Sequence, residues 1–190
     1  MRDIVILGGP NGAGKTTAAP FVVPRELGIR EFVNADEIAR GLSPFNVEGV
    51  AVAAGRLMLD RMRLLVREGE SFAFETTCFG RAHACWVRAC KADGWRIILV
   101  YLWLRSPQLA IDRVARRVRQ GGHHIPEDVV VRRYHTGLVN MRRLYLPLAN
   151  LAGIYDNSYY RRTPIAECSP ETGLVVHDAR LWGTIERQTP

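Results

Sequence analysis

The sequence predicts a single α/β domain in which helices flank a mostly parallel, five-stranded sheet. Three observations support this fold class. Apolar segments of strand length alternate with segments of helical periodicity. A glycine-rich loop separates the first of these strands from the first helix. The chain has 190 residues, of which 47% are hydrophobic, so it can bury a substantial core.

Each predicted element has a local signal. Residues 3–7 form a short apolar strand, and the helix that begins at Lys15 is expected to be short or kinked because Pro20 and Pro24 interrupt it. A long helix is predicted over residues 47–68. Its buried side is expected to contain Val50, Ala54, Leu57, Met58, Met62 and Leu65. The other predicted strands are 31–34, 71–75, 96–104 and 152–155, with a small hairpin strand near 174–176. The other predicted helices are one from 36–39 to 41–44, and 82–92, 107–119 and 126–146.

The strand ends predict where a ligand binds. In open α/β sheets, ligands bind at the carboxyl ends of the parallel strands. This rule places residues 9–16, 34–37, 75–77 and 157–158 along one rim of the sheet. The chain contains no repeat, low-complexity segment or linker, so residues 1–190 are expected to form one domain.

Residues 9–16 have the spacing of a phosphate-binding loop, which is Gly, four residues, Gly, Lys and then Ser or Thr. Glycines let backbone N–H groups turn toward phosphate oxygens, and the following helix N-terminus adds a partial positive charge. Lys15 is expected to reach the β- and γ-phosphates, and the Thr16 hydroxyl to bind Mg²⁺. The nucleotide-binding residues predicted here are Gly9, Pro10, Asn11, Gly12, Ala13, Gly14, Lys15, Thr16 and Thr17.

Two acidic residues lie on the same rim. Asp36 is placed to accept a proton from an attacking hydroxyl, or else it is a first-turn acid or cap of its helix. Glu75 is placed to bind Mg²⁺ through water or to hold the acceptor, or else it forms a structural ion pair with an arginine. Thr76 and Thr77 are placed to donate to the same ligand as Glu75, or else they cap the next helix.

An arginine-rich segment, residues 113–133, is expected to form a lid. It contains Arg113, Arg116, Arg117, Arg119, Arg132 and Arg133. Gly121 and Gly122 lie between its two helices and are expected to act as a hinge that closes over the phosphates, although a rigid helix–helix turn is the alternative. About half of the arginines are expected to face solvent. His123 is expected to bond to substrate or loop rather than to a metal, because adjacent histidines point in different directions.

Composition excludes several classes of function. The net charge is +7, but the arginines concentrate in the lid segment rather than along a continuous surface, so no nucleic-acid partner is expected. No apolar run reaches the length of a membrane span, so no membrane partner is expected either. The four scattered cysteines form no metal-binding or CxxC pattern and indicate a reducing, cytoplasmic environment.

Several separate segments together resemble the zeta toxin-like family of P-loop kinases. These segments are 9–17, 33–45, 72–77, 117–126, 132–134 and 155–158. The combination of Asn-Ala-Asp at 34–36, Phe-Glu-Thr-Thr at 74–77 and Gly-Gly-His at 121–123 is far more specific than the phosphate loop alone. The resemblance extends from Ile4 to about Ala166, and the Arg161-Arg162 pair departs from the pattern.

The resemblance implies a kinase that uses ATP or GTP, with UDP-N-acetylglucosamine as the acceptor in the toxins. It implies that Asp36 is the catalytic base, Lys15 the phosphate-binding lysine, and Asn157 a neighbour of the nucleotide base. Arg119 and Arg132 are the chosen phosphate-contacting arginines, with Arg116 and Arg133 as close competitors.

The expected function is therefore a Mg²⁺-dependent phosphotransferase for a hydroxyl of a small acceptor, a sugar nucleotide first among them. The residues expected to contact the acceptor are Asn34, Glu75, Thr76, Arg116, His123 and Arg133. A kinase for an antibiotic or nucleoside and a non-catalytic ATP-binding regulator are the alternatives. The resemblance also admits an antitoxin-like protein partner, for which the sequence carries no separate segment.

Overall fold

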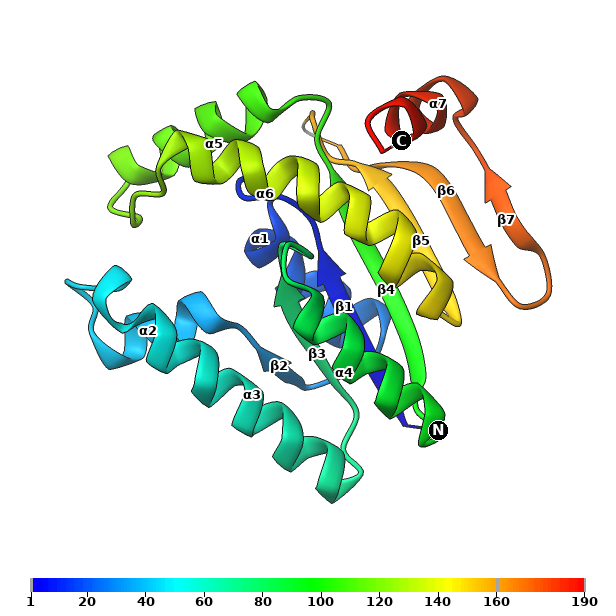
Figure 1. Ribbon diagram of the computed structural model, residues 1–190, viewed down its shortest axis with the longest axis horizontal. Helices are drawn as coiled ribbons and strands as arrows, with labels where there is room; N and C mark the ends of the chain where they lie inside the picture. Colours follow the sequence, from blue (N-terminus) through cyan, green and yellow to red (C-terminus); the bar gives the residue numbers. More distant parts are fainter. Residues whose placement is uncertain (1, 160, 190) are drawn as a thin grey trace.

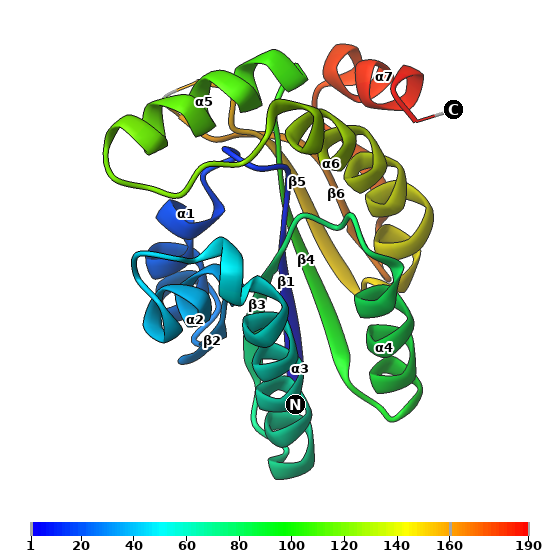
Figure 2. The same cartoon turned by 60° about the vertical axis from the view of Figure 1, so that its left-hand side comes forward.

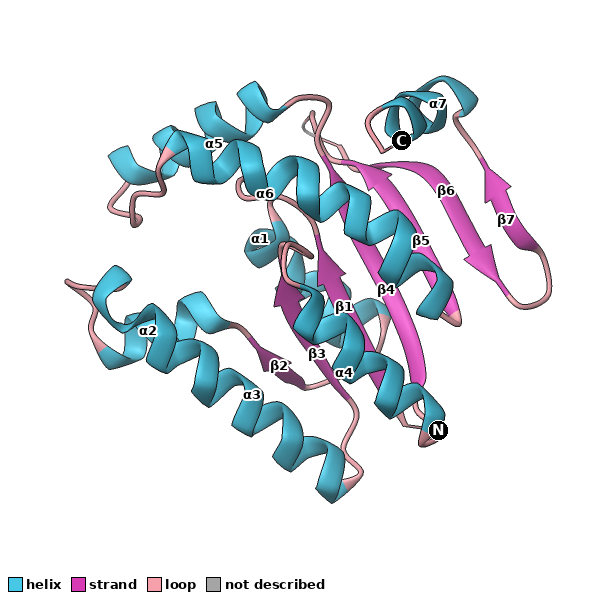
Figure 3. Ribbon diagram, viewed as in Figure 1, coloured by secondary structure: helices cyan, strands magenta, loops and turns pink. Residues whose placement is uncertain are grey.

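The computed structural model describes residues 2–159 and 161–189 and contains one seven-stranded sheet with helices on both faces (Figures 1 and 3). The strand order is β2-β3-β1-β4-β5-β6-β7, and the first five strands in this order are parallel. The strands are β1 (Asp3–Gly8), β2 (Glu31–Val33), β3 (Phe72–Thr76), β4 (Arg96–Trp103), β5 (Leu151–Asp156), β6 (Thr163–Ser169) and β7 (Gly173–Val176). The α/β class is confirmed, but the expected number of five strands is wrong because the antiparallel β6 and β7 extend the sheet.

The helices agree with the predicted segments up to residue 148. The α-helices are α1 (Lys15–Phe21), α2 (Ala35–Leu42), α3 (Ala51–Glu68), α4 (Arg81–Ala92), α5 (Pro107–Arg119), α6 (Glu127–Asn140) and α7 (Ala179–Arg187). Pro20 lies inside the seven-residue α1, and a π-helical segment, η1 (Val22–Glu26), follows it, so the expected short first helix is confirmed. Three further short segments are η2 (Glu48–Val50), η3 (Met141–Tyr145) and η4 (Leu146–Leu148).

Alternate side chains of the central strands point into two separate cores. Ile4 and Ile6 of β1 pack with the buried sides of α3, α4 and α7, whereas Val5 and Leu7 pack with α1, α5 and part of α6. This alternation follows from the two-residue period of a strand that is covered on both faces. The prediction that Leu57 belongs to the buried side of α3 is wrong, because its side chain is exposed.

The five parallel strands direct their carboxyl ends at one rim, where α5 and α6 lie (Figures 1 and 2). β1 pairs with β3 and β4, so the ends of these strands adjoin, with Leu7 beside Glu75 and Gly8 beside Thr76. No helix in the described part of the chain is both long and apolar enough to cross a bilayer. The fold therefore gathers the polar residues of the rim around the end of β1.

Candidate active site

The loop between β1 and α1 is a tight turn that requires glycine. Gly12 and Gly14 have φ angles of 75° and 83°, in the left-handed region where other residues are strained. A Cβ on Gly12 would lie 2.9 Å from the carbonyl oxygen of Ala110, and one on Gly14 would lie 2.9 Å from Nδ2 of Asn157. The loop is thus packed against α5 and against the end of β5, which fixes its shape before any ligand arrives.

A cleft of about 520 Å³ opens beside this loop at the rim of the sheet. Its lining includes twelve of the residues that the sequence predicts for the site. They are Asn11, Gly12, Gly14, Lys15, Thr16, Thr17, Asn34, Asp36, Glu75, Thr76, Arg116 and Arg133. Segments far apart in the chain therefore meet where the strand-end rule places them.

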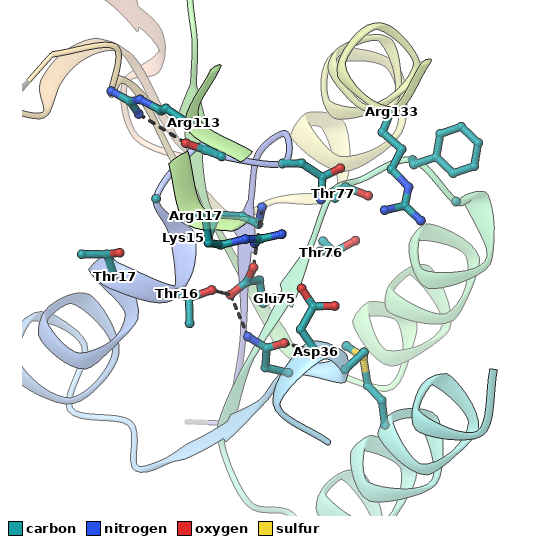
Figure 4. A pocket seen from close by; sticks show the side chains of 18 of the residues that line it. Lys15, Thr16, Thr17, Asp36, Glu75, Thr76, Thr77, Arg113, Arg117 and Arg133 are labelled. Atoms are coloured by element: carbon teal, nitrogen blue, oxygen red, sulfur yellow. Dashed lines mark hydrogen bonds and ion pairs between the residues drawn. The ribbon is translucent and has the colours of Figure 1, made fainter. Parts of the chain in front are cut away.

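Glu75 is the centre of a polar network on the floor of the cleft (Figure 4). Its Oε2 accepts hydrogen bonds of 2.9 Å from the Thr16 hydroxyl and from Nδ2 of Asn34. Its Oε1 lies 3.6 Å from Nζ of Lys15, which donates to the carbonyl oxygen of Pro10 at 2.9 Å. Glu75 thus pairs with Lys15 of the loop, and not with an arginine as the alternative of a structural ion pair predicted.

Asp36 lies in the first turn of α2, with its side chain directed at the cleft. The cap of this helix is Asn34, whose Oδ1 accepts the backbone N–H of Asp36 at 2.8 Å. Within the described residues the Asp36 carboxylate accepts no side-chain hydrogen bond. Asp36 is therefore not the cap of its helix, and its carboxylate remains available to a ligand.

One side of α5 supplies cations to the opposite wall. Arg113, Arg116, Arg117 and Gln120 all line the cleft, at the i, i+3, i+4 and i+7 spacing of one helix face. The Arg113 guanidinium donates to the carbonyl oxygens of Gly12 at 3.3 Å and Ser158 at 2.9 Å. Burial lowers the pKa of Arg113, with a further lowering from Arg116 nearby.

Arg117 carries a buried side-chain atom that has no hydrogen-bond partner among the described residues. Its Nη2 donates to the carbonyl oxygen of His123 at 3.4 Å, whereas its Nε is buried without a hydrogen-bond partner in the described structure. An unpaired buried guanidinium donor is costly, and an anion in the cleft would satisfy it. Asn11 carries a similar unsatisfied atom, the buried Oδ1, on the loop side.

The structure does not bring Arg119 and Arg132 to the cleft. Arg119 lies two residues beyond Arg117, which turns it to the opposite side of the helix, and it is exposed. The Arg132 guanidinium lies 5.7 Å from the centre of the Phe79 ring, and its neighbour Arg133 lines the cleft instead. The choice of Arg119 and Arg132 over their competitors thus has no support in this geometry.

Five more predicted residues lie around the cleft rather than in its lining. Gly9, Pro10 and Ala13 are buried residues of the loop and do not line the cleft. Nδ2 of Asn157 donates to the carbonyl oxygen of Ala13 at 2.7 Å, so Asn157 holds the loop. His123 lies in an adjoining hollow beside Gly121 and Gly122.

Sequence reasoning did not select the wall beside Thr76 and Thr77, which consists of Met58, Phe79, Gly80, Ala82 and His83. The loop that carries Phe79 is fastened from α6 and η3. Nδ2 of Asn140 donates to the carbonyl oxygens of Cys78 at 2.9 Å and Phe79 at 2.8 Å, and the Tyr145 hydroxyl donates to Gly80 at 3.2 Å. These long-range contacts leave no local sequence signal.

Burial shifts the pKa of His83, which belongs to this wall, and of Cys78, which precedes Phe79 in the chain. It raises the pKa of the Cys78 thiol to about 12, partly offset by Lys15, so this cysteine is a protonated packing residue and not a nucleophile. Burial also lowers the pKa of His83, whose ring packs on Phe74 with 5.6 Å between centroids. His83 is accordingly neutral at pH 7.

The residues fit a bound nucleotide with magnesium. The Thr16 hydroxyl and the Glu75 carboxylate are 2.9 Å apart, and both are the oxygen donors that Mg²⁺ prefers. No group of three or more His, Cys, Asp and Glu side chains suited to a metal occurs in the described residues. A magnesium ion here would accordingly depend on the phosphates and on water for its other ligands, as is usual for this ion.

The loop, the parallel sheet and the arginine-bearing helices define a P-loop protein with the fold of the P-loop kinases. A sequence model of the family described as AAA domain matches residues 4–136, which is more than half of the chain. The chain belongs to this AAA domain family. An uncharacterized protein of Haemophilus influenzae is 28% identical over 126 residues, which are 66% of this chain and 88% of that protein.

Two solved structures share the fold across nearly the whole chain. The complex AvrRxo1-ORF1:-ORF2 with ATP superposes with a TM-score of 0.73 at 16% identity, covering 97% of this chain and 63% of that chain. The PezAT toxin–antitoxin system of Streptococcus pneumoniae superposes with a TM-score of 0.70 at 16% identity, covering 100% of this chain and 78% of that chain. The chain thus spans less than two thirds of the AvrRxo1 chain that it matches.

Proposed function

We propose that this protein is an ATP-dependent phosphotransferase that moves the γ-phosphoryl group to a hydroxyl of a small acceptor. The observation that carries the proposal is the arrangement of charges around one cleft. The Lys15 ammonium and the Asp36 carboxylate line the same cavity, on either side of the Glu75 network. A protein that only binds ATP has no need of an acid on the acceptor side.

The proposed chemistry assigns one task to each charge. Asp36 accepts the proton of the acceptor hydroxyl as it attacks. Lys15 holds the β- and γ-phosphates, and Arg117 and Arg116 offset the charge that spreads over the transferred group. Bound Mg²⁺, held by Thr16 and Glu75, would neutralise the phosphates. Asn34 keeps Glu75 in place through its 2.9 Å hydrogen bond.

We propose a sugar nucleotide such as UDP-N-acetylglucosamine as the first acceptor to test. Support comes from the sequence resemblance and from the charge of the cleft. Among the described residues its lining contains two carboxylates, Asp36 and Glu75, against five cations, Lys15, Arg113, Arg116, Arg117 and Arg133. This excess favours an anionic acceptor over a cationic aminoglycoside. A neutral nucleoside is the second candidate acceptor, since the wall around Phe79 is apolar.

The same proposal covers the phosphoryl donor, the cellular location of the protein and a protein partner. ATP is proposed ahead of GTP, and a cytoplasmic location agrees with the supply of either. An antitoxin-like partner is suggested by the similarity in fold to PezAT, which is a toxin–antitoxin system.

The direct test is a transfer assay with product identification. Purified protein, Mg²⁺ and ATP or GTP are incubated with a panel of sugar nucleotides, nucleosides and aminoglycosides, and products are identified by mass. We expect one anionic acceptor to gain 80 Da, the mass of one phosphoryl group. Consumption of ATP without any phosphorylated acceptor, or phosphorylation of an aminoglycoside alone, would contradict the proposal.

A further inference from the structure

A second hollow, of about 350 Å³, lies outside the catalytic cleft. One side is Arg40 near the end of α2 together with Phe45 and Glu48 of the segment that follows, and the other side is the turn between α5 and α6, with His123 and His124. Phe45 lines the hollow and is fully exposed, so burial of its ring contributes nothing to the stability of the fold. The hollow is at the small end of the size range of ligand pockets.

The hollow and the cleft adjoin through shared neighbours. The carbonyl oxygen of His123 accepts from Arg117, which lines the cleft. The Asp36 carboxylate is close enough to His123 to act on its charge, and Arg40 lies one helical turn beyond Asp36. A molecule whose hydroxyl reaches Asp36 can therefore extend into the second hollow.

The two cavities differ in charge. Five cations against two carboxylates line the cleft. In the hollow, Arg40 pairs with Glu37 of its own helix at 3.3 Å, and Glu48 is a second acid in the lining. The hollow has no surplus of positive charge and is not built for a phosphate. Arg40, Glu48 and the two imidazoles instead offer both donors and acceptors beside an aromatic face.

We propose that this hollow is the distal subsite of the acceptor and takes a neutral polar ring, which packs its face on Phe45 and presents its edge to His123 and Glu48. The ring is either a heterocyclic base or a sugar, because both combine a flat or apolar face with a hydrogen-bonding edge. The proposal rests on the proposed function in one respect, namely that the reacting hydroxyl lies at Asp36. The acceptor is therefore a two-part molecule, with its anionic part among the arginines and its neutral ring at Phe45.

The test measures ring binding directly, so that it does not depend on phosphoryl transfer. Saturation-transfer NMR on the full chain, with a non-hydrolysable ATP analogue bound, would use uridine, adenosine and methyl α-glucoside as probes. We expect at least one probe to bind the wild type at millimolar concentration and Phe45→Ala to weaken it roughly tenfold. Phe45→Tyr should retain binding, because it keeps the aromatic face.

Phe21→Ala is the matched control, because Phe21 is an exposed phenylalanine on α1, away from the hollow. It should leave probe binding unchanged, and none of the variants should alter affinity for the ATP analogue. A nucleoside signal identifies a base, and a glucoside signal a sugar. The proposal is overturned if no probe binds or if Phe45→Ala binds as the wild type does. Ring binding without any phosphorylated acceptor would support the subsite while counting against the kinase.

Discussion

Replacing Asp36 with Asn separates catalysis from helix stability more cleanly than any other change in the cleft. The amide keeps the size of the carboxylate but cannot accept the hydroxyl proton. General-base catalysis contributes roughly 10²–10⁴-fold in rate, which is about 3–5 kcal/mol in activation free energy. The helix loses only a first-turn acid, worth about 0.3–1 kcal/mol, because Asn34 and not Asp36 is its cap.

Glu37→Gln is the matched control for this prediction. Glu37 is the other acid of the same first turn, but it is exposed, pairs with Arg40 at 3.3 Å and does not line the cleft. Both variants should lose a similar small amount of unfolding free energy in urea titrations. Only Asp36→Asn should lose transfer in a single-turnover assay with labelled ATP.

The reasoning is refuted if Asp36→Asn transfers phosphate within a few-fold of the wild type. It is also refuted if Glu37→Gln loses as much rate as Asp36→Asn, because the effect would then come from the helix and not from the base. ATP affinity provides a further check, since the loss of proton acceptance should leave it nearly unchanged.

Four further predictions follow from the same geometry. Lys15→Met should abolish transfer while far-ultraviolet circular dichroism stays unchanged, because it removes the charge beside Glu75 but keeps the buried stem; retained turnover would contradict the kinase. Arg117→Ala should lower kcat by about 10²-fold or more and Arg119→Ala by less than threefold, since only Arg117 lines the cleft; equal losses would contradict this assignment. Burial lowers the pKa of His83 from its ordinary 6.5, so the unfolded chain binds a proton more readily than the folded chain, and the free energy of unfolding falls as the pH drops through 6.5. Urea titrations of the wild type should show this loss between pH 7.5 and 5.5, and His83→Gln should remove up to about 1.4 kcal/mol of it. The same pH dependence in His83→Gln as in the wild type would exclude this role. Amide hydrogen exchange should slow across residues 118–126 when an ATP analogue and acceptor bind, and exchange that ligands leave unaltered would rule out a lid there.

The parallel half of the fold could be predicted because its signals are local. Each strand of β1 to β5 is a short apolar run, and each intervening helix ends at glycine or proline or carries a clear apolar stripe. β6 was missed because Pro164 and Glu167 interrupt its pattern, and three of its seven residues are exposed. α7 has a local sequence signal as well, because Asp178 is a typical N-cap residue and Leu181, Trp182 and Ile185 have the spacing of one buried helix side. The prediction from sequence did not include this helix.

The strand-end rule predicts those site residues that lie at the carboxyl ends of neighbouring parallel strands. The topology alone brings together Glu75 near the end of β3, Lys15 after β1 and Asp36 after β2. The choice among the arginines needs further information, namely which side of α5 faces the loop. The buried Ala110 and Val114 carry that information, since Arg113 and Arg117 lie three residues after them and so on a neighbouring part of the helix surface.

The contacts of α5 and α6 restrict how much of the arginine-rich segment can move. Arg113 is bonded to the phosphate loop, and the Tyr134 hydroxyl donates to the carbonyl oxygen of Leu104 at 2.6 Å. Gly137 allows α6 to approach the carbonyl of Thr77, so the second half of this helix is fixed to the loop after β3. A lid over the whole of 113–133 would break these buried contacts, whereas movement about Gly121 would break few of them. Any closure should therefore carry His123 and the backbone of the turn across the cleft, and leave the arginines of α5 already in place.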